Sequence, residues 1–517
     1  MAPARGTTLA LLGVCLFAVT MVAGAATAPD RTVAGADPTP APTPANTATP
    51  AGTASPGSPG TPGTGGTATP DGTPTPATPR TLVGVQGGWV THGNIQMYSR
   101  SSEVWRATDA DGYFEVTMLD DGTVLAAFAN ETSDECGALA SPCARTGYRH
   151  IDPSGPNGPE VVSEYSFPVA SITNSEVHAV DRVREGAYVF TDMDEERVVL
   201  VENDSVVWEW RAEGFYDAPP DPTSRDWLHI NDVDSLGDGR FLVSVRNANQ
   251  ILVVERGEGV VEVVNEDDGG DDSTCRRDGR LDDFDGDGEV RCGDPSVFRE
   301  QHNPQWIGPR AVLVADSDND RVVEVQKTDD GDWEPAWVVR EVNGRELHWP
   351  RDADRLPNGN TLITDSLNRR VVEVGPNGSA VWSVDTTGPS GPNIPYEADR
   401  LPYGECAGRF SPPSNPTPGN GTGNATTATP TPRGVTDLPT AARGGDLDGE
   451  TGGEIPFLTL AVVGMRGTFG WFPLWFGELH LALTIVAAGL VLAGGTDTLL
   501  QSGALDGLRD RVRAVRE

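Results

Sequence analysis

Three stretches of the 517-residue chain share one pattern of hydrophobic and polar positions. Each holds an apolar, β-branched segment, a polar turn and a second apolar segment, and the stretches are residues 189–201, 313–325 and 362–374. A short segment containing a tryptophan follows each one, at Trp208, Trp337 and Trp382. Such a pattern is typical of short β-strands joined by tight turns. The chain is therefore predicted to repeat one β-sheet unit.

The length of the repeat indicates the architecture. A further strand with an aspartate and a turn supplies a fourth strand, at Asp181, Asp234, Asp354 and Asp399. Histidines in matching places are separated by 229 − 178 = 51 and 348 − 302 = 46 residues. Four antiparallel strands repeated at this spacing are typical of propeller blades. We therefore predict an all-β propeller over residues 82–410.

The number of blades depends on how the ring closes. After Asp399 the chain runs into low-complexity sequence, so the last blade lacks its outer strands. The segment Gly93–Arg106, which includes Trp105, supplies them from the other end of the chain. This closure predicts six blades. Five or seven blades stay open as alternatives, because Phe114–Pro168 fits the repeat irregularly.

The N-terminal part of the chain carries a different pattern. Residues 1–28 hold an apolar run and then small residues, which predicts a secretory signal peptide; an uncleaved anchor is the alternative. Residues 29–81 and 411–455 are rich in Pro, Thr, Ala, Gly and Ser and are predicted to be disordered stalks or linkers.

Residues 456–497 are predicted to be a membrane segment. An aromatic cluster precedes the apolar run Leu479–Gly495, and its members are Trp471, Phe472, Trp475 and Phe476. Four arginines lie in the tail 498–517, namely Arg509, Arg511, Arg513 and Arg516. Positive residues favour the cytoplasmic side, so we expect one transmembrane helix with the propeller outside the cell membrane. A hairpin of two spans is less favoured because Arg466 interrupts the apolar sequence.

Charge narrows the classes of partner. The chain has 38 Lys+Arg against 76 Asp+Glu, so its formal charge is 38 − 76 = −38, and Lys327 is the only lysine. An acidic chain that uses arginine is typical of a protein solvated at high salt, which suggests a haloarchaeon; an ordinary acidic secreted protein is the alternative. Nucleic acid is not expected as a partner, because no basic face is available for phosphates.

The cysteines fit an exported protein. Cys15 lies in the N-terminal apolar run, and Cys406 lies at the end of the propeller segment. The other four form two neighbouring pairs in the sequence, Cys136 with Cys143 and Cys275 with Cys292. Pairs of this kind predict two disulfides in an oxidising compartment.

Candidate functional residues lie just before the predicted innermost strand of several blades. Four of the seven histidines have this position, namely His178, His229, His302 and His348. Each alone is explained by a hydrogen bond to a neighbouring blade, but together they favour a shared site in the channel. Arg246 interrupts the repeat, because serine or methionine occupies its place elsewhere. Arg197, Arg321 and Arg370 recur in register, which favours a role in stabilising turns.

Several motifs resemble one enzyme family. Trp-Leu-His229-Ile-Asn231-Asp-Val, Ser-Val-Arg246-Asn, Gln-His302-Asn303 and Leu-Pro-Asn-Gly-Asn-Thr-Leu-Ile look like the arylsulfotransferase propellers over most of residues 82–406. The resemblance implies an exported six-bladed enzyme that moves a sulfuryl group between phenols, without a catalytic cofactor, through a sulfated histidine. It implies that the binding constellation is His229, His302, Asn231, Asn303, Arg246 and Arg321.

The nucleophile does not follow from these motifs. His348 is the nearest candidate, but its flanks do not match the family, and the last blade has Tyr396 and Glu397 where a histidine is expected. The rival interpretation is therefore a non-catalytic cell-surface propeller that binds a ligand, a glycan or a protein partner.

The segment 266–298 is an acidic insertion that contains a possible metal site. Asp283, Asp285 and Asp287 are followed by Gly288, and Asp294 occupies the twelfth position. This spacing resembles an EF-hand or dockerin-type loop and predicts a Ca²⁺ site. An acidic surface loop is the alternative.

Overall fold

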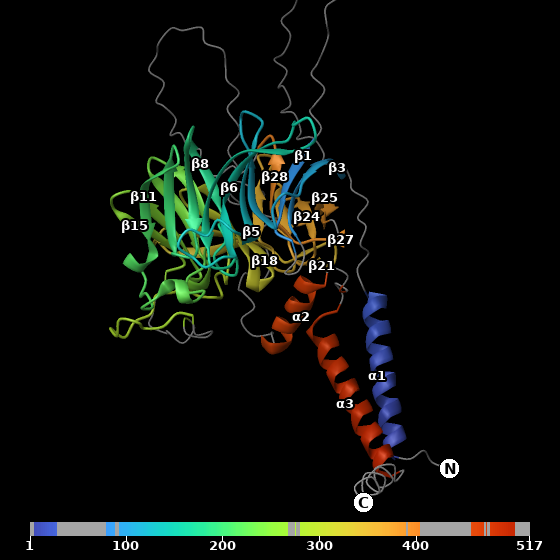
Figure 1. Ribbon diagram of the computed structural model, residues 1–517. Helices are drawn as coiled ribbons and strands as arrows, with labels where there is room; N and C mark the ends of the chain where they lie inside the picture. The colour runs from blue at the N-terminus through green and yellow to red at the C-terminus, as the bar shows by residue number, and fades with distance from the viewer. Residues whose placement is uncertain are drawn as a thin grey trace, which may run out of the picture.

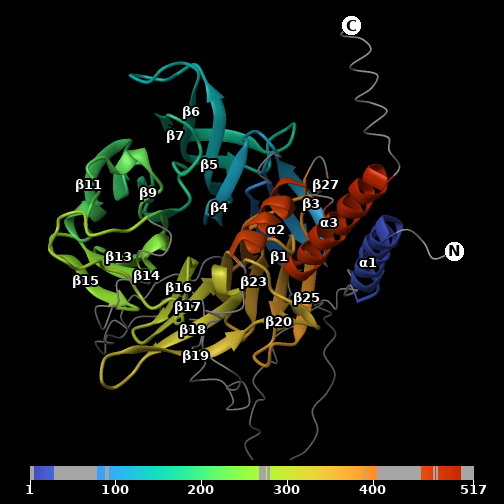
Figure 2. The ribbon, with the colours of Figure 1, turned by 90° about the horizontal axis from the view of Figure 1, so that it is seen from below.

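The computed structural model describes residues 5–27, 79–87, 92–266, 275, 280–388, 391–403, 456–469, 472 and 476–501. Within these residues, the strands form a ring of six four-stranded antiparallel sheets (Figures 1 and 2). The six-bladed propeller is therefore confirmed. The predicted stalks, Cys406, Trp471, Trp475 and the arginines of the tail lie outside the described residues.

Five blades are built from consecutive strands, with the innermost strand first. The first two are β4 (Gly112–Met118), β5 (Val124–Ser133), β6 (Cys143–Asp152), β7 (Glu160–Val169), and β8 (Val180–Arg184), β9 (Ala187–Asp192), β10 (Arg197–Glu202), β11 (Ser205–Arg211). The next two are β12 (Ile230–Gly237), β13 (Arg240–Val245), β14 (Gln250–Glu255), β15 (Gly259–Val264), and β16 (His302–Gly308), β17 (Ala311–Asp316), β18 (Arg321–Lys327), β19 (Trp333–Val339). The fifth is β22 (Asp352–Arg355), β23 (Thr361–Asp365), β24 (Arg370–Val374), β25 (Ala380–Asp385).

The connections hold smaller elements. Two hairpins flank the fifth blade: β20 (Glu341–Val342) with β21 (Arg345–Glu346), and β26 (Thr387–Gly388) with β27 (Gly391–Pro392). The 3-10 turns are η1 (Ala212–Gly214), η2 (Pro222–Ser224), η3 (Arg246–Ala248) and η4 (Ser317–Asn319).

The sixth blade joins the two ends of the propeller. It combines β28 (Pro395–Leu401) as the innermost strand with β1 (Arg80–Val85), β2 (Asn94–Ser99) and β3 (Ser102–Ala107). The pair β1–β28 is antiparallel, with Arg80 opposite Leu401 and Gly84 opposite Glu397. The predicted closure by both ends is thus correct, and the N-terminal end contributes one strand more than the sequence indicated.

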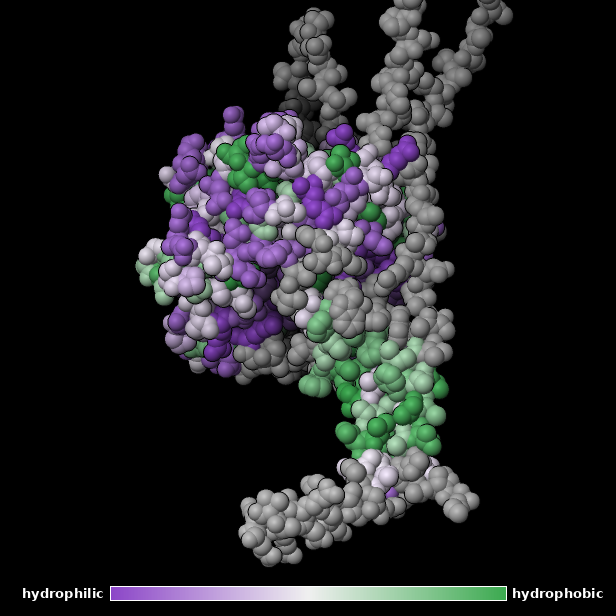
Figure 3. Space-filling model, turned by 45° about the vertical axis from the view of Figure 1, so that its right-hand side comes forward, coloured by the Kyte–Doolittle hydropathy of each residue, from purple (hydrophilic) through white to green (hydrophobic). Residues whose placement is uncertain are grey.

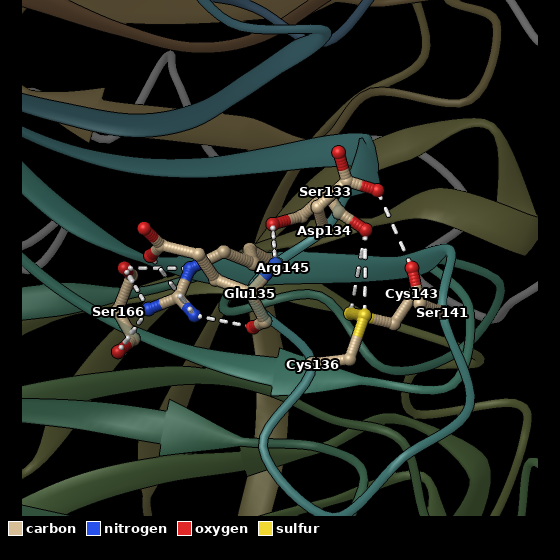
Figure 4. The surroundings of a disulfide bond; sticks show 8 residues. All are labelled: Ser133, Asp134, Glu135, Cys136, Ser141, Cys143, Arg145 and Ser166. Atoms are coloured by element: carbon tan, nitrogen blue, oxygen red, sulfur yellow. Dashed lines mark hydrogen bonds and ion pairs between the residues drawn. A yellow bond between two sulfur atoms is a disulfide. The ribbon is translucent and has the colours of Figure 1, made fainter.

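The irregular blade β4–β7 is stapled by a disulfide. Cys136 and Cys143 are bonded where β5 leads into β6 (Figure 4). Arg145 Nη1 donates to the Glu135 carbonyl at 2.9 Å, and Arg145 Nε donates to Ser166 Oγ at 3.2 Å (Figure 4). The second predicted disulfide, Cys275–Cys292, is also present.

The hydrophobic core lies between the blades. Six buried clusters each combine residues of neighbouring sheets. Val189 of β9, for example, shares a cluster with Val243 of β13, and Val83 of β1 shares one with Trp382 of β25. Burying β-branched side chains on both faces of a strand produces the continuous apolar runs of the repeat. The same runs therefore define the strands and hold the ring together.

Side chains of the innermost strands link each blade to the next. Glu115 accepts the Val180 N–H at 2.7 Å, and Asp181 accepts the Ser235 N–H at 3.0 Å. Four further hydrogen bonds join the other pairs of neighbouring blades. The donors and acceptors are Asn231 Nδ2 and the Gln301 carbonyl, Arg355 N–H and the Gln305 side chain, Ala398 N–H and the Asp352 side chain, and Val116 N–H and the Glu397 side chain. The acidic residues of the channel thus have a structural role at the blade junctions.

The recurring arginines stabilise turns, as their register suggested. Each pairs with the aspartate five positions earlier, across the turn between the second and third strands. The pairs are Arg197–Asp192 at 2.7 Å, Arg321–Asp316 at 2.5 Å and Arg370–Asp365 at 2.7 Å.

Three helices lie below the ring (Figure 1): α1 (Arg5–Thr27), α2 (Pro456–Thr468) and α3 (Glu478–Gln501). Within the described residues, one helix segment, Glu478–Thr498, is long and apolar enough to cross a bilayer. Figure 3 shows apolar residues gathered on the helices and hydrophilic residues over most of the visible propeller. The predicted membrane helix is thus present as an apolar helix, which by itself is weak evidence for anchoring.

The N-terminal helix packs against α3, and the two run antiparallel (Figures 1 and 2). A side chain at Gly13 would approach the Ala487 carbonyl oxygen to 2.6 Å and Val491 Cγ2 to 2.8 Å. Small residues allow such close approach between apolar helices.

Candidate functional site

A cavity of about 420 Å³ lies in the channel where the innermost strands begin. It is lined by Gln86, Asp111, Gly112, Phe114, Ala129, Glu131, Ile172, Thr173, Asn174, Glu176, His178, His229, Arg246, His302, Trp349 and Arg351. These residues come from all six blades or from the connections before them. The propeller geometry thus gathers side chains that are far apart in the sequence.

Three of the four predicted histidines meet in this cavity. The rings of His178 and His229 lie 5.5 Å apart between centroids. Tyr396 lies between His178 and His302, with centroid distances of 5.1 Å and 6.0 Å. All three histidines are buried. The shared channel site that the sequence suggested therefore has a geometric basis for these three.

His229 is held by a carboxylate. Its Nδ1 lies 2.6 Å from Asp226 Oδ1, so Nδ1 carries the proton and Nε2 keeps its lone pair. Burial, followed by the nearby Arg246 cation, lowers the pKa of His229 to about 4. Although burial acts in the opposite direction, His229 and the arginines Arg246 and Arg280 hold the pKa of Asp226 well below its usual value. At neutral pH the pair is therefore a neutral imidazole beside an ionised carboxylate.

His302 has the same tautomer for a different reason. Ser317 Oγ lies 2.8 Å from His302 Nδ1 and donates its own proton to the Pro350 carbonyl at 2.7 Å. The serine oxygen must then accept from Nδ1–H, which leaves Nε2 unprotonated. Burial lowers the pKa of His302 and that of His178 well below the usual value. All three pocket histidines are consequently neutral.

Two buried arginines, Arg246 and Arg351, line the cavity together with the carboxylates of Asp111, Glu131 and Glu176. Arg246 pairs with Glu300 and lies 3.8 Å from Asp226 Oδ2. The Arg351 guanidinium lies over the Trp349 ring at 4.0 Å and over the Tyr396 ring at 5.1 Å. The Nε of each arginine has no hydrogen-bond partner among the described residues. Burial lowers the pKa of Arg351 to about 10, so it stays charged at neutral pH.

The other predicted site residues lie elsewhere among the described residues. His348 is not part of the cavity lining, and its Nδ1 lies 3.1 Å from Asp320 Oδ1. Asn231 donates to the Gln301 carbonyl at the junction between two blades. Asn303 is buried outside the lining. Arg321 donates to the carbonyls of Ser296 and Val297, at 2.9 and 2.7 Å, in addition to its bond with Asp316.

The sequence analysis missed several residues of the pocket. Arg351 follows His348 by three positions, and Asp226 precedes His229 by three. Asp226 directly precedes the motif that begins Trp-Leu-His229, and Arg351 lies close to the candidate His348. Trp349 has a positive φ of 52°, and Trp349 and Arg351 line the cavity although His348 does not. In the sequence, the only indication that Arg351 and Asp226 belong near the site is that each lies three positions from a candidate histidine.

The predicted metal loop forms a compact carboxylate group. Oxygens of Asp283, Asp285 and Asp287 and of Asp217 lie within 4.8 Å of one another. Asp217 precedes η2, so it comes from a different loop. Asp294 is not in this group, and its Oδ1 accepts the Ser296 N–H at 2.8 Å. Burial and repulsion from the other three aspartates raise the pKa of Asp217.

The fold and the pocket together define a six-bladed propeller with a channel site lined by histidines, two arginines and several carboxylates. A family model described as Arylsulfotransferase (ASST) matches residues 175–334. The matched segment contains His178, His229, Arg246 and His302, and it ends before Arg351. The match covers less than half of the chain, and it supports sulfuryl transfer as the general activity.

Solved structures similar to this chain do not indicate which reaction it catalyses, because the sequence identities and TM-scores are low. A protein of unknown function from Bacteroides caccae is 12% identical, with 63% of this chain and 99% of that chain covered and a TM-score of 0.41. A periplasmic gluconolactonase of Pseudomonas aeruginosa is 14% identical, with 62% and 98% covered and a TM-score of 0.36. A virginiamycin B lyase from Staphylococcus aureus is 9% identical, with 59% and 85% covered and a TM-score of 0.34. No curated protein matches the chain.

Proposed function

We propose that the protein transfers a sulfuryl group between phenolic compounds through a sulfated histidine. One observation supports this most directly. Two buried arginines, Arg246 and Arg351, face a cavity that also holds three neutral imidazoles. The arginines supply the charge that a sulfate group needs, and the imidazoles supply nucleophilic nitrogen. The family match, which covers the three histidines and Arg246 but ends before Arg351, agrees with this proposal.

The first step uses His229 as the nucleophile. Its Nε2 lone pair attacks the sulfur of an aryl sulfate, so an N–S bond forms while the S–O bond to the ring breaks. The aryl group leaves as phenolate. The imidazole gains positive charge in this step, and the carboxylate of Asp226 at Nδ1 offsets that charge. His302 faces a serine hydroxyl at Nδ1 and lacks this compensation.

The second step returns the sulfuryl group to an oxygen. An acceptor phenol attacks the sulfur, the O–S bond forms, and the N–S bond to His229 breaks. The phenolic proton passes to Nε2 of a second neutral imidazole, His178 or His302. Arg246 and Arg351 balance the charge on the sulfuryl oxygens throughout. Phe114 and Trp349 line the same cavity and suit a phenyl ring.

Transfer from p-nitrophenyl sulfate to a second phenol, measured in multimolar KCl, tests the proposal. We expect nitrophenol to appear continuously only when an acceptor is present. Without acceptor, mass spectrometry should find one SO₃ group on a histidine peptide. Folded protein that is inert with a range of donors and acceptors would instead support the rival function, a cell-surface propeller that binds a ligand without turning it over. The observation that favours this rival is that Tyr396, where the family resemblance leads us to expect a further histidine, packs against His178 and His302.

We also propose that α3 spans the cell membrane with the propeller on the extracellular side. Arginines follow α3 in the sequence, and positive residues favour the cytoplasmic side. Because α1 packs antiparallel to α3, its N-terminal end lies beside the C-terminal end of α3 (Figure 1).

A separate proposal concerns the insertion, where Asp217, Asp283, Asp285 and Asp287 would bind one Ca²⁺. Carboxylate oxygens suit this ion, and Gly288 has the positive φ of 98° that the sixth loop position requires. Isothermal titration of Ca²⁺ in high KCl should show one site. The Asp217→Asn variant should weaken binding about tenfold or more, whereas Asp294→Asn should leave it unchanged. The opposite ranking of these two variants would restore Asp294 as the ligand, and absence of binding would reject the site.

A further inference from the structure

We propose that the pocket takes amphiphilic phenols, in which an apolar tail stays in the bilayer while the phenolic head enters the channel. This inference rests on the proposed function and names its substrate class. It follows from the direction in which the pocket opens and from the side chains around its mouth.

The innermost strands begin on the face of the ring that carries the pocket. On the fifth blade, Asp352 at the start of β22 lies opposite Thr364 near the end of β23. The turn after β23, residues 366–369, therefore lies on this same face. Arg369 Nη2 donates to the Arg466 carbonyl of α2 at 2.5 Å and lies 3.4 Å from the Phe469 carbonyl. Helix α2 is thus docked on the face where the pocket opens.

The apolar helices leave the propeller from this face. Arg466 Nη2 also lies 3.5 Å from the Phe476 carbonyl, so α2 is tied to the segment that leads into α3. In Figure 2, seen from below, α2 overlies the ring near β23, α3 extends past the edge of the ring, and α1 lies beside that edge. If α3 crosses the bilayer, the pocket opens toward the membrane surface.

Helix α2 is amphipathic in a way that suits this surface. It buries Leu458, Val462 and Arg466, which are spaced four residues apart, and leaves Phe457 74% exposed. A short helix that buries one face in protein and exposes aromatic side chains on another is typical of membrane interfaces. Leu479, at the start of α3, is also exposed.

Near solvent the pocket lining mixes one apolar residue, half-buried Ile172, with polar side chains that include Asp111 and the exposed Glu131. Ile172 lies in the connection between β7 and β8, beside the exposed residues Thr173 and Asn174. Phe114 and Trp349 continue the lining toward the histidines. A substrate with an anionic or phenolic head and an apolar tail would contact both the buried arginines and the apolar part of the lining, which is Ile172, Phe114 and Trp349. A wholly polar phenol would use only the inner part.

An assay of the full chain in phosphatidylglycerol vesicles can distinguish two routes by which the acceptor reaches the pocket, from the membrane or from water. The donor is p-nitrophenyl sulfate, and the acceptors are alkylphenols of increasing tail length at fixed total concentration. Each two added methylenes lower the aqueous acceptor concentration about tenfold. An enzyme fed from water must slow by that factor, whereas we expect the rate to stay constant or to rise with tail length.

Variants test whether the mouth and α2 cause this behaviour. Ile172→Asp and Phe457→Asp should each reduce the rate with long-tailed acceptors about tenfold. Val261→Asp changes an equally apolar residue, 49% exposed on β15, and should have no effect. A rate that falls with tail length while short phenols are turned over would overturn the membrane route and leave the proposed function intact. Failure with every phenol would reject the proposed function itself.

Discussion

Replacing His229 with glutamine is expected to lower sulfuryl transfer by about 10³-fold or more, because covalent capture then lacks its nucleophile. Glutamine keeps a polar side chain of similar length but offers no basic nitrogen. The same variant should show no SO₃ group on the peptide that contains position 229. Steady-state release of nitrophenol and mass spectrometry of donor-treated protein measure the two effects.

Replacing the carboxylate of Asp226, the partner of His229, is expected to reduce the rate less than replacing His229 itself. Asp226→Asn should reduce the rate by about 10²-fold, because the amide cannot offset an imidazolium and can favour the other tautomer. His150→Gln is the matched control, since His150 lies on β6 against Tyr188 and outside the cavity lining. A sulfated His302 or His348, with an active His229→Gln variant, would move the nucleophile to that residue.

Arg321→Ala is expected to destabilise the protein by about 3–5 kcal/mol, because it leaves the buried carboxylate of Asp316 without its cation. Both side chains are 0% exposed. Arginine also satisfies the carbonyls of Ser296 and Val297, which would lose their donors. Denaturant unfolding at fixed KCl measures the change in the free energy of unfolding.

A surface pair provides the comparison. Arg310 pairs with Asp329, and their side chains are 55% and 100% exposed. Arg310→Ala should therefore change the free energy of unfolding by about 0–1 kcal/mol. Sulfuryl transfer per folded molecule should be unchanged in Arg321→Ala. A selective loss of activity at normal stability would instead make Arg321 a substrate-binding residue, as the family resemblance implied.

The propeller could be predicted from the sequence because its core lies between the blades, so that the strands bury both faces. Strands that bury both faces must be apolar throughout, so the runs at 313–325 and 362–374 mark blades directly. Strand β1 was partly missed because Arg80 and Thr81 adjoin the low-complexity stretch and were assigned to it. Its strand identity comes from pairing with β28, a partner more than 300 residues away.

The site was harder to predict because a residue's place in the repeat does not fix the direction of its side chain. His178, His229 and His302 line the cavity, whereas His348 is outside the lining. Asn231 fits the family motif, but its amide bonds the next blade. Arg351 and Asp226 have no separate signal in a single sequence, because their roles depend on packing against Tyr396 and on contact with Arg246.

The closing blade has a consequence for how the molecule bears mechanical load. Arg80 at the start of β1 and Leu401 at the end of β28 lie opposite each other, so a pull on both connections would peel this pair apart one hydrogen-bonded step at a time. Such an unzipping geometry resists force poorly, because the bonds are loaded singly. Helix α1 precedes β1 in the sequence and α3 follows β28, so the packing of α1 against α3 links the two chain segments outside the β1–β28 pair. Tension between the termini would then be carried by the helix pair, and the ring would stay shut while that pair holds.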